Sequence, residues 1–228
     1  MNTEIKNKLI PFSSLDEASV FVRENKGMYI SMNLQALVDE TIIDLLMNPN
    51  VYGYADGIGA QVFLNRKCGV KTVKIPGCEL WLNILQQEKS KSYSIAIIGS
   101  SPETNTQTVA KLKREFPNHN ISYFVDGYNF EEEQLLGELS STNVDMVFIA
   151  LGQPRQEVLG NKILNVIPNV TVLGLGGSFD VFCGVINRAP KFFITLHIEW
   201  LYRILLEPKR SIKLAISVSR YFVMMLKS

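Results

Sequence analysis

One carboxylate has sequence neighbours suited to chemistry. Asp56 lies in the stretch "GYADGIGAQVFLNRK" (53–67), between a short apolar run that predicts a strand and a run with helical period. Gly53, Gly57 and Gly59 flank it, and glycines let a backbone approach a ligand closely. Ligands of α/β proteins bind at the carboxyl ends of strands, where Asp56 is expected. The alternative is that Asp56 only caps the helix.

A second polar cluster follows the apolar run "DMVFIA". The stretch "ALGQPRQEVLG" contains two amides, a guanidinium and a carboxylate, at Gln153, Gln156, Arg155 and Glu157. Pro154 suits the first turn of a helix, and backbone N–H groups at a helix start favour phosphate. Arg155 could pair with that phosphate, and the two amides could contact polar ligand edges. Alternatively, Arg155 is a solvated side chain and Glu157 a capping-box acid.

A glycine-rich turn follows the apolar run "VTVL". The stretch "GLGGSFDVFCGVINRAP" (174–190) begins with Gly174, Gly176 and Gly177. It does not match the G-x-G-x-x-G pattern of dinucleotide-binding folds, but a phosphate or sugar site remains open. Arg188 is either an anion contact or a helix-end residue.

Apolar runs alternate with helical patterns along the chain. Strands are expected within 28–33, 71–75, 93–99, 121–125, 145–152 and 170–176. Three of these runs are almost continuously apolar, as in strands buried on both faces of a parallel sheet. The segments "PETNTQTVAKLKREF" and "EEEQLLGELSS" have the spacing of covering helices. Ser100 or Ser101, before Pro102, is a good helix start. The alternation predicts an α/β fold with a mostly parallel sheet flanked by helices.

The composition changes near residue 190. We expect an α/β catalytic domain over 1–190 and a basic helical appendage over 191–228. Basic residues recur about seven apart in this appendage, interleaved with apolar runs such as "YFVMML". Such a helix either packs its apolar side on the core or lies on an anionic membrane surface. The apolar end of the chain favours the membrane.

Composition excludes several classes of protein. The chain has 228 residues, 46% hydrophobic, with a formal net charge of +1, so overall charge gives no argument for nucleic acid. The three cysteines are scattered and indicate reduced thiols of an intracellular protein. There is no signal-peptide pattern and no apolar run of about 18 residues. We therefore expect a soluble or peripheral cytosolic protein.

Several catalytic motifs are missing from the sequence. It contains no P-loop, no H-E-x-x-H and no G-x-S-x-G. It also lacks the D-x-D pair with which many sugar-nucleotide enzymes hold a divalent metal. The charge of a diphosphate would then be met by arginine, lysine and helix N-termini.

The order of these segments, "ADGIG", "LGQPRQE", "GLGGSFDVF", "RAP", "EWLYR" and "EPKR", resembles the WecG/TagA/CpsF glycosyltransferases, also called glycosyltransferase family 26. The likeness extends from about Asn33 to Arg210, and the last three blocks together are highly specific. It implies a Rossmann-like fold whose C-terminal appendage engages the membrane. It also implies inverting transfer from a UDP-sugar to a polyprenyl-diphosphate-linked saccharide in surface polysaccharide synthesis, at the cytoplasmic face of a bacterial plasma membrane and without a metal.

The resemblance assigns roles to single residues. Asp56 matches the general base that deprotonates the acceptor hydroxyl, and Asn33 matches a polar residue near that base. Other matching positions are expected to bind substrate: Gly57, Gln153, Arg155, Gln156 and Glu157 of the first two segments, Gly176, Gly177 and Asp180 of the glycine turn, and Arg188, Arg203 and Arg210, which are expected to face diphosphates.

One segment departs from the family pattern. Where relatives have Arg-x-x-Gly-x-Asp-Leu, this chain has "KIPGCEL", with Lys74 for arginine and Glu79 for aspartate. Lysine keeps the charge but loses bidentate geometry. Lys74 is still expected to bind substrate, but the identity of the sugar is left open.

Two other functions compete with the glycosyltransferase. One is a nucleotide-dependent oxidoreductase on a doubly wound sheet, and the other is a non-catalytic subunit of a polysaccharide assembly complex. The oligomeric state is also open, with a homo-oligomer among the options.

Overall fold

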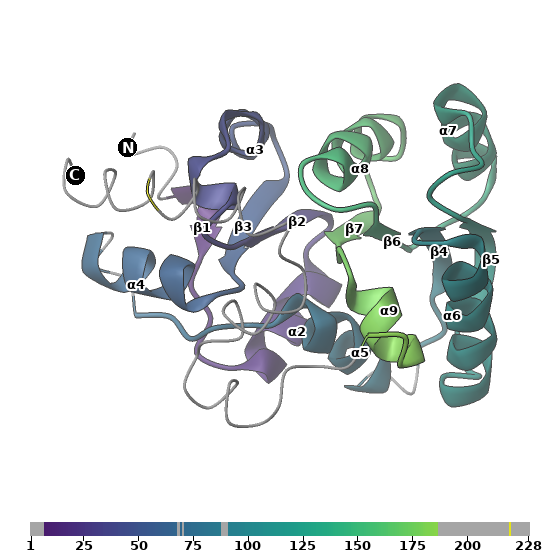
Figure 1. The fold of residues 1–228 in the computed structure, drawn as a ribbon, viewed down its shortest axis with the longest axis horizontal. Coiled ribbons are helices and arrows are strands. Elements are labelled where there is room, and N and C mark those ends of the chain that lie inside the picture. The colour runs from purple at the N-terminus through teal and green to yellow at the C-terminus, as the bar shows by residue number, and fades with distance from the viewer. Residues whose placement is uncertain (1–6, 68, 70, 88–90, 187–218, 220–228) are drawn as a thin grey trace.

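The computed structural model describes residues 7–67, 69, 71–87, 91–186 and 219 of the chain. Within these residues, seven strands form one sheet in the order β1-β3-β2-β7-β6-β4-β5, and all neighbours are parallel (Figure 1). The strands are β1 (Leu9–Ile10), β2 (Gly27–Met32), β3 (Val51–Ala55), β4 (Ser94–Gly99), β5 (Asn120–Val125), β6 (Met146–Ala150) and β7 (Thr171–Gly174).

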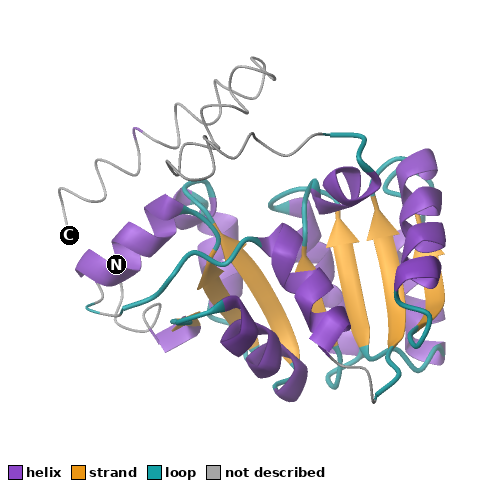
Figure 2. Cartoon of the chain, turned by 90° about the horizontal axis from the view of Figure 1, so that it is seen from below, coloured by secondary structure: helices purple, strands orange, loops and turns teal. Residues whose placement is uncertain are grey.

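Helices cover both faces of this sheet (Figures 1 and 2). One face carries α3 (Glu40–Leu46), α7 (Glu132–Ser141) and α8 (Arg155–Val166). The other carries α2 (Leu15–Glu24), α5 (Gly77–Gln87), α6 (Pro102–Glu115) and α9 (Ser178–Cys183). The short η1 (Ala36–Val38) precedes α3, and α4 (Ile58–Lys67) follows β3. The predicted α/β fold with a parallel, Rossmann-like sheet is confirmed.

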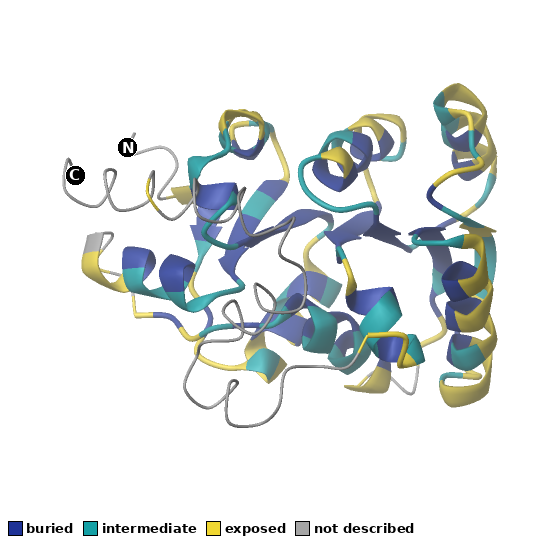
Figure 3. Cartoon of the chain, viewed as in Figure 1, coloured by how far each residue is buried: buried dark blue, intermediate teal, exposed yellow. Residues whose placement is uncertain are grey.

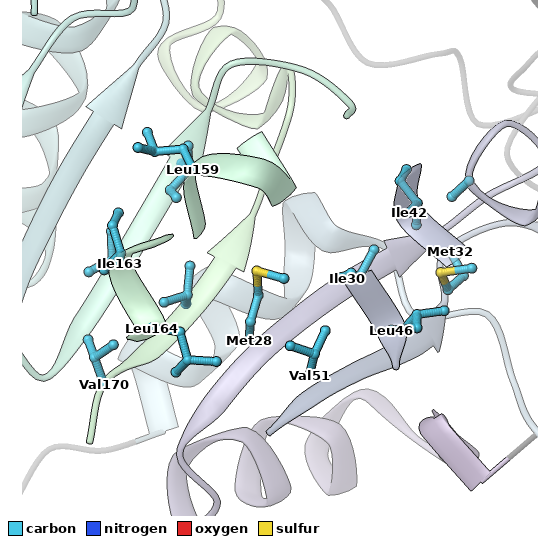
Figure 4. Packing of buried hydrophobic residues seen from close by; sticks show 14 of the residues in the cluster. Met28, Ile30, Met32, Ile42, Leu46, Val51, Leu159, Ile163, Leu164 and Val170 are labelled. Carbon is cyan, nitrogen blue, oxygen red and sulfur yellow. The ribbon is translucent and has the colours of Figure 1, made fainter. Parts of the chain in front are cut away.

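The central strands are buried on both faces, which explains their continuous apolar sequences. Every residue of β2 and β6 is buried (Figure 3). On one face Met28, Ile30 and Met32 of β2 belong to a cluster with side chains of α3 and α8 (Figure 4). On the other face Tyr29 belongs to a cluster that includes Trp81 of α5. Alternate residues of one strand therefore serve two separate cores.

Five of the six expected runs contain a strand, and the expectation for 71–75 is wrong. Its backbone N–H groups donate to different segments, Val73 to Phe12 O (2.9 Å) and Ile75 to Ala55 O (2.7 Å). No ladder with a single partner strand forms, so the segment is a tethered loop. The two-residue β1 was not predicted, because it is too short to show a period.

The helix starts show what each polar group does locally. Ser101, not Ser100, caps α6, and its Oγ accepts from Thr104 N–H (3.2 Å). Pro154 occupies the cap position of α8. Proline has no N–H for Glu157 to bind, so the capping-box interpretation of Glu157 is wrong.

The expected domain boundary near 190 and the basic helix over 191–228 lie outside the described residues. In the part of the chain that the structure describes, no helix is long and apolar enough to cross a membrane.

Two helical glycines give a matched test of this packing. A Cβ on Gly160 of α8 would lie 2.7 Å from Met28 Sδ and 3.1 Å from Val172 Cγ1, whereas a Cβ on Gly137 of α7 would meet nothing within 4 Å. We expect Gly160→Val to lower the free energy of unfolding by about 1–3 kcal/mol through overpacking. Gly137→Ala should raise it by about 0.5–1 kcal/mol. Urea unfolding measures both, and equal effects of the two changes would contradict this packing.

Candidate functional site

Side chains from distant segments meet where four adjacent strands, β3, β2, β7 and β6, end. We call this group the carboxyl-edge network. Its members are connected by hydrogen bonds, directly or through the Ser31 backbone, and are Ser31, Asn33, Asp56, Gln153, Gln156 and Glu157. It occupies the edge of a parallel sheet at which α/β proteins bind ligands.

Asp56 lies directly after β3, half-buried. Its Oδ2 accepts a 2.5 Å hydrogen bond from the Ser31 hydroxyl, and its backbone N–H donates to Met32 O (3.0 Å). A Cβ on Gly77, the first residue of α5, would lie 3.3 Å from Asp56 Oδ2 and 3.1 Å from Tyr54 Oη. The carboxylate is therefore held between the end of β2 and the start of α5.

Tyr54 adds a buried hydroxyl beside this carboxylate. The hydroxyl is enclosed by the protein, close to the Ser31 hydroxyl and to Asp56. Burial, and then the negative charge of Asp56, raises the pKa of Tyr54 well above its usual value. Tyr54 is therefore a neutral phenol near Asp56.

Gln153 connects the loop after β6 to the end of β2. Its Nε2 donates to Ser31 O (2.8 Å) and to Glu157 Oε1 (3.1 Å), and its Oε1 accepts from Asn33 Nδ2 (2.9 Å). Asn33 Oδ1 in turn accepts from two backbone N–H groups of the following turn. Both ends of the Asn33 amide are thereby oriented by the protein.

Gln156 and Glu157 are turned into the protein, 2% and 1% exposed. Gln156 Nε2 donates to Glu157 Oε1 (2.8 Å), and Gln156 Oε1 accepts from Gly176 N–H (2.9 Å). Gly174 leaves room for this side chain, since a Cβ there would lie 2.6 Å from Gln156 Nε2. Glu157 Oε2 has no hydrogen-bond partner among the residues described. Burial raises the pKa of Glu157, although the two glutamine amides oppose this.

A second group of residues lies at the switch point of the sheet. The chain leaves β4 toward β5 but leaves β6 in the opposite direction, toward β7, which is where open α/β sheets bind ligands. Ser100, with a positive φ of 61°, follows β4 there. Its hydroxyl donates to Asp180 Oδ1 (3.1 Å). The glycine turn after β7 thereby lies between this group and the carboxyl-edge network.

Two exposed side chains flank the switch point. Gly127 N–H donates to Ser100 O (2.8 Å), so the loop after β5 rests on the turn after β4. Tyr128, the next residue, is 78% exposed. Arg155 at the start of α8 is exposed, with its guanidinium 5.7 Å from the centre of the Phe130 ring.

Most of the sequence-predicted residues come together, in two neighbouring groups. Gly57 packs against Asn33, since a Cβ on it would lie 3.8 Å from that residue. Lys74 precedes Ile75, which is bonded to the last residue of β3, so the "KIPGCEL" segment passes Asp56. Exposed Gly177 adjoins Asp180 in the glycine turn. Arg188, Arg203 and Arg210 lie outside the described residues.

Sequence reasoning did not assign a site role to four residues. Ser31 had one available signal, as a polar residue in the otherwise apolar strand "MYISM". Tyr54 had another, since it stands two residues before Asp56, which directly follows the same strand, and therefore on the same face. Ser100 and Tyr128 had none, because their positions depend on how the strands pair.

A metal-binding cluster or a surface groove would be an alternative to this site. No group of three or more metal-binding side chains occurs within the described part of the chain. A groove of about 520 Å³ lies along α5, α6 and α9. It contains Glu79 but none of the residues expected to bind substrate, so the site is assigned to the carboxyl edge instead.

The sequence matches the model of the "Glycosyl transferase WecG/TagA/CpsF family" over residues 11–228. Two similar proteins come from Bacillus spizizenii (strain ATCC 23059 / NRRL B-14472 / W23) and Bacillus subtilis (strain 168). Both are named N-acetylglucosaminyldiphosphoundecaprenol N-acetyl-beta-D-mannosaminyltransferase. The first is 31% identical over 95% of this chain and 90% of the relative. The second is 33% identical over 84% of this chain and 74% of the relative.

The raised pKa of Glu157 predicts a specific pH dependence of stability. An acid whose pKa is higher in the folded state stabilises the fold at low pH and loses that contribution as pH rises through the folded-state pKa. Wild type should therefore lose stability relative to Glu157→Gln as pH rises from about 4.5, the usual pKa of the acid. Urea unfolding of both proteins between about pH 4.5 and 8 measures the difference. A constant difference would show that Glu157 does not titrate in this way.

Proposed function

Because this chain belongs to the WecG/TagA/CpsF glycosyltransferase family, we propose that it transfers an N-acetylhexosamine, with inversion, from a UDP-sugar to a polyprenyl-diphosphate-linked saccharide. The observation that carries this proposal is the Asp56 carboxylate, anchored by Ser31 at the carboxyl edge of the sheet. This carboxylate stands in the "ADG" segment of the family likeness, and its place at the carboxyl edge supports the proposed role.

The relatives support the acceptor class and give the first sugar to test. Their name specifies N-acetylglucosaminyl-diphosphoundecaprenol as acceptor and N-acetyl-β-D-mannosamine as the transferred sugar. The match to the first relative covers nearly the whole of both chains. We therefore propose N-acetylmannosamine as the first donor sugar to test with this chain, and GlcNAc-diphosphopolyprenol as the first acceptor to test.

In the proposed reaction Asp56 acts as general base. Its carboxylate removes the proton from the acceptor hydroxyl as the hydroxyl oxygen attacks the anomeric carbon. The bond from that carbon to the UDP oxygen breaks on the opposite side, so configuration inverts. Asn33, fixed by Gln153, contacts the acceptor near the base. The hydrogen bond from Ser31 restrains the carboxylate during proton transfer.

The switch point is the proposed location of UDP. The exposed ring of Tyr128 offers a stacking surface for a base. The N-termini of α6 and α8 follow β4 and β6, and their backbone N–H groups favour phosphate oxygens. Arg155 is positioned at the start of α8 to meet the same charge. Arg188, Arg203 and Arg210 are proposed, from the family likeness, to contact diphosphate.

The remaining parts of the proposal rest on the sequence. We infer that the basic segment 191–228 holds the enzyme at the inner face of a bacterial plasma membrane, and that no metal cofactor is needed. Family membership argues against the oxidoreductase, as does a glycine turn that does not match G-x-G-x-x-G. The non-catalytic subunit is excluded if transfer is measured.

Replacing the base tests the reaction. We expect Asp56→Asn to lower kcat about 10²- to 10⁴-fold, the usual contribution of a general base. Transfer from UDP-N-acetylmannosamine to a short-chain GlcNAc-diphospholipid measures it. Exposed Asp44 of α3 provides the control Asp44→Asn, which should retain full activity. Thermal stabilisation of Asp56→Asn by UDP would show an intact donor site, and wild-type turnover by that variant would refute the role of Asp56.

Chelation tests the absence of a metal cofactor. If helix N-termini and basic side chains meet the diphosphate charge, transfer should continue at an unchanged rate after dialysis against EDTA. Added Mg²⁺ or Mn²⁺ should not raise it by more than about twofold, since no transition-state charge is left for a metal to stabilise. Loss of activity on chelation, restored by one of these ions, would show a metal requirement.

A further inference from the structure

Glu157 is a buried acid that the proposed mechanism does not use. Its side chain is almost fully enclosed, and its Oε2 has no hydrogen-bond partner among the described residues. A buried polar atom without a partner destabilises a fold. Buried polar groups that are not satisfied in this way call for an explanation beyond stability.

The other oxygen of Glu157 is a shared acceptor. Glu157 Oε1 receives Nε2 of Gln153 (3.1 Å) and Nε2 of Gln156 (2.8 Å). When the amide nitrogen of a glutamine donates a hydrogen bond to one partner, the amide oxygen of the same side chain points away from that partner. Gln153 therefore presents Oε1 to Asn33, and Gln156 presents Oε1 to the Gly176 N–H. One carboxylate oxygen thus helps set the direction of two amides.

We propose that Glu157 is a positioning residue for sugar transfer, which acts through Gln153 to hold Asn33 and Ser31 beside the base Asp56. This inference rests on the proposed function. It differs from the role in substrate binding that the sequence suggested for Glu157, because a side chain 1% exposed has no surface to offer a ligand.

The contacts form a continuous path from Glu157 to the base. Both protons of Gln153 Nε2 are used, one by Glu157 Oε1 and one by Ser31 O (2.8 Å). The Ser31 hydroxyl then donates to Asp56 Oδ2. The path links α8, the loop after β6, the end of β2 and the residue after β3.

A branch of the same path orients Asn33. Its Nδ2 gives one proton to Gln153 Oε1, and its Oδ1 accepts from two backbone N–H groups. Asn33 is only half-buried, so the oriented amide can contact an acceptor-sugar oxygen. Without Glu157, Gln153 loses one of its two acceptors and this orientation is less well determined.

Kinetics of Glu157→Met test the proposal. Methionine has similar length but no acceptor oxygen, so Gln153 and its neighbours should shift. A misplacement near 1 Å at a reacting centre can cost about 10²-fold, and we expect kcat to fall about 30-fold. The KM for the UDP-sugar should change less than about threefold, because in this proposal Glu157 does not touch the donor. A rise in donor KM with kcat retained would instead place Glu157 in donor binding and overturn the proposal.

Glu157→Gln is the conservative variant. It restores a carbonyl oxygen that can accept from both glutamines, so it should recover kcat to within about threefold of wild type. A loss as large as that of Glu157→Met would show that the charge matters and not the acceptor. Glu133→Met, at an exposed acid in the first turn of α7, is the matched control and should leave kcat unchanged.

A double-mutant cycle tests whether Glu157 acts through Gln153. We expect Gln153→Met to lower kcat by a similar factor, and the double variant to be little worse than either single one. Multiplied effects would show that the two residues act independently, which would refute the path. If Glu157→Met does not fold, Glu157→Ala, which also lacks an acceptor oxygen, takes its place in the cycle, and the same non-additivity is expected.

The two proposals fail in different ways. A wild-type protein that transfers no sugar to lipid-diphosphate acceptors, yet is stabilised by UDP, refutes the proposed function, and the inference fails with it. A wild-type protein that transfers sugar normally, with a Glu157→Met variant equal to it in kcat, refutes only the role of Glu157.

Discussion

Parallel pairing of β2 with both β3 and β7 is the constraint on which the site depends. The register places Met32 beside Ala55, and Tyr29 beside Leu173, so three strands end at one edge of the sheet. Asn33 and Gln153 are 120 positions apart in the chain, yet their amides meet at 2.9 Å. Two cores, one on each face of β2, hold that register, because a slip of one residue would exchange the residues that face each core. The relative positions of the site residues are thus fixed by apolar packing in the two cores, away from the site itself.

The sequence predicts the fold because buried parallel strands have continuous apolar runs, and these also locate the loops that follow them. Asp56 and the polar turn at Gln153 were found in this way. The segment 71–75 shows the limit of the method. Its residues have strand composition, but its backbone N–H groups donate to three separate residues, Asn65, Phe12 and Ala55. Composition indicates the strand propensity of a segment. It does not indicate whether a neighbouring strand has an unpaired edge with which the segment could form a ladder.

The sequence does not show the direction in which a polar side chain points. Gln156 and Glu157 lie among residues that suit ligand recognition, and the structure turns both inward. The cause lies in other elements: Gly174 leaves space for the Gln156 amide, and Gly176 supplies the N–H that it accepts. Ser31 was overlooked for the complementary reason, since only the pairing of β2 with β3 brings it to Asp56. The contacts that set the orientation of a side chain come from segments distant in the sequence, so residue type and local spacing do not reveal them.

The bond between Gln156 and the Gly176 N–H has a mechanical consequence. It joins the start of α8 to the turn after β7, and α8 is itself packed on the sheet through Leu159 and Ile163. These two parts form a stiff wall, since moving the turn would require moving a buried helix. The loop that carries Tyr128 faces this wall across the switch point: Gly127 N–H donates to Ser100 O, Phe130 packs on the core, and the Tyr128 ring is exposed to solvent. A ligand between them would be bounded on one side by a buried helix and on the other by an exposed aromatic ring.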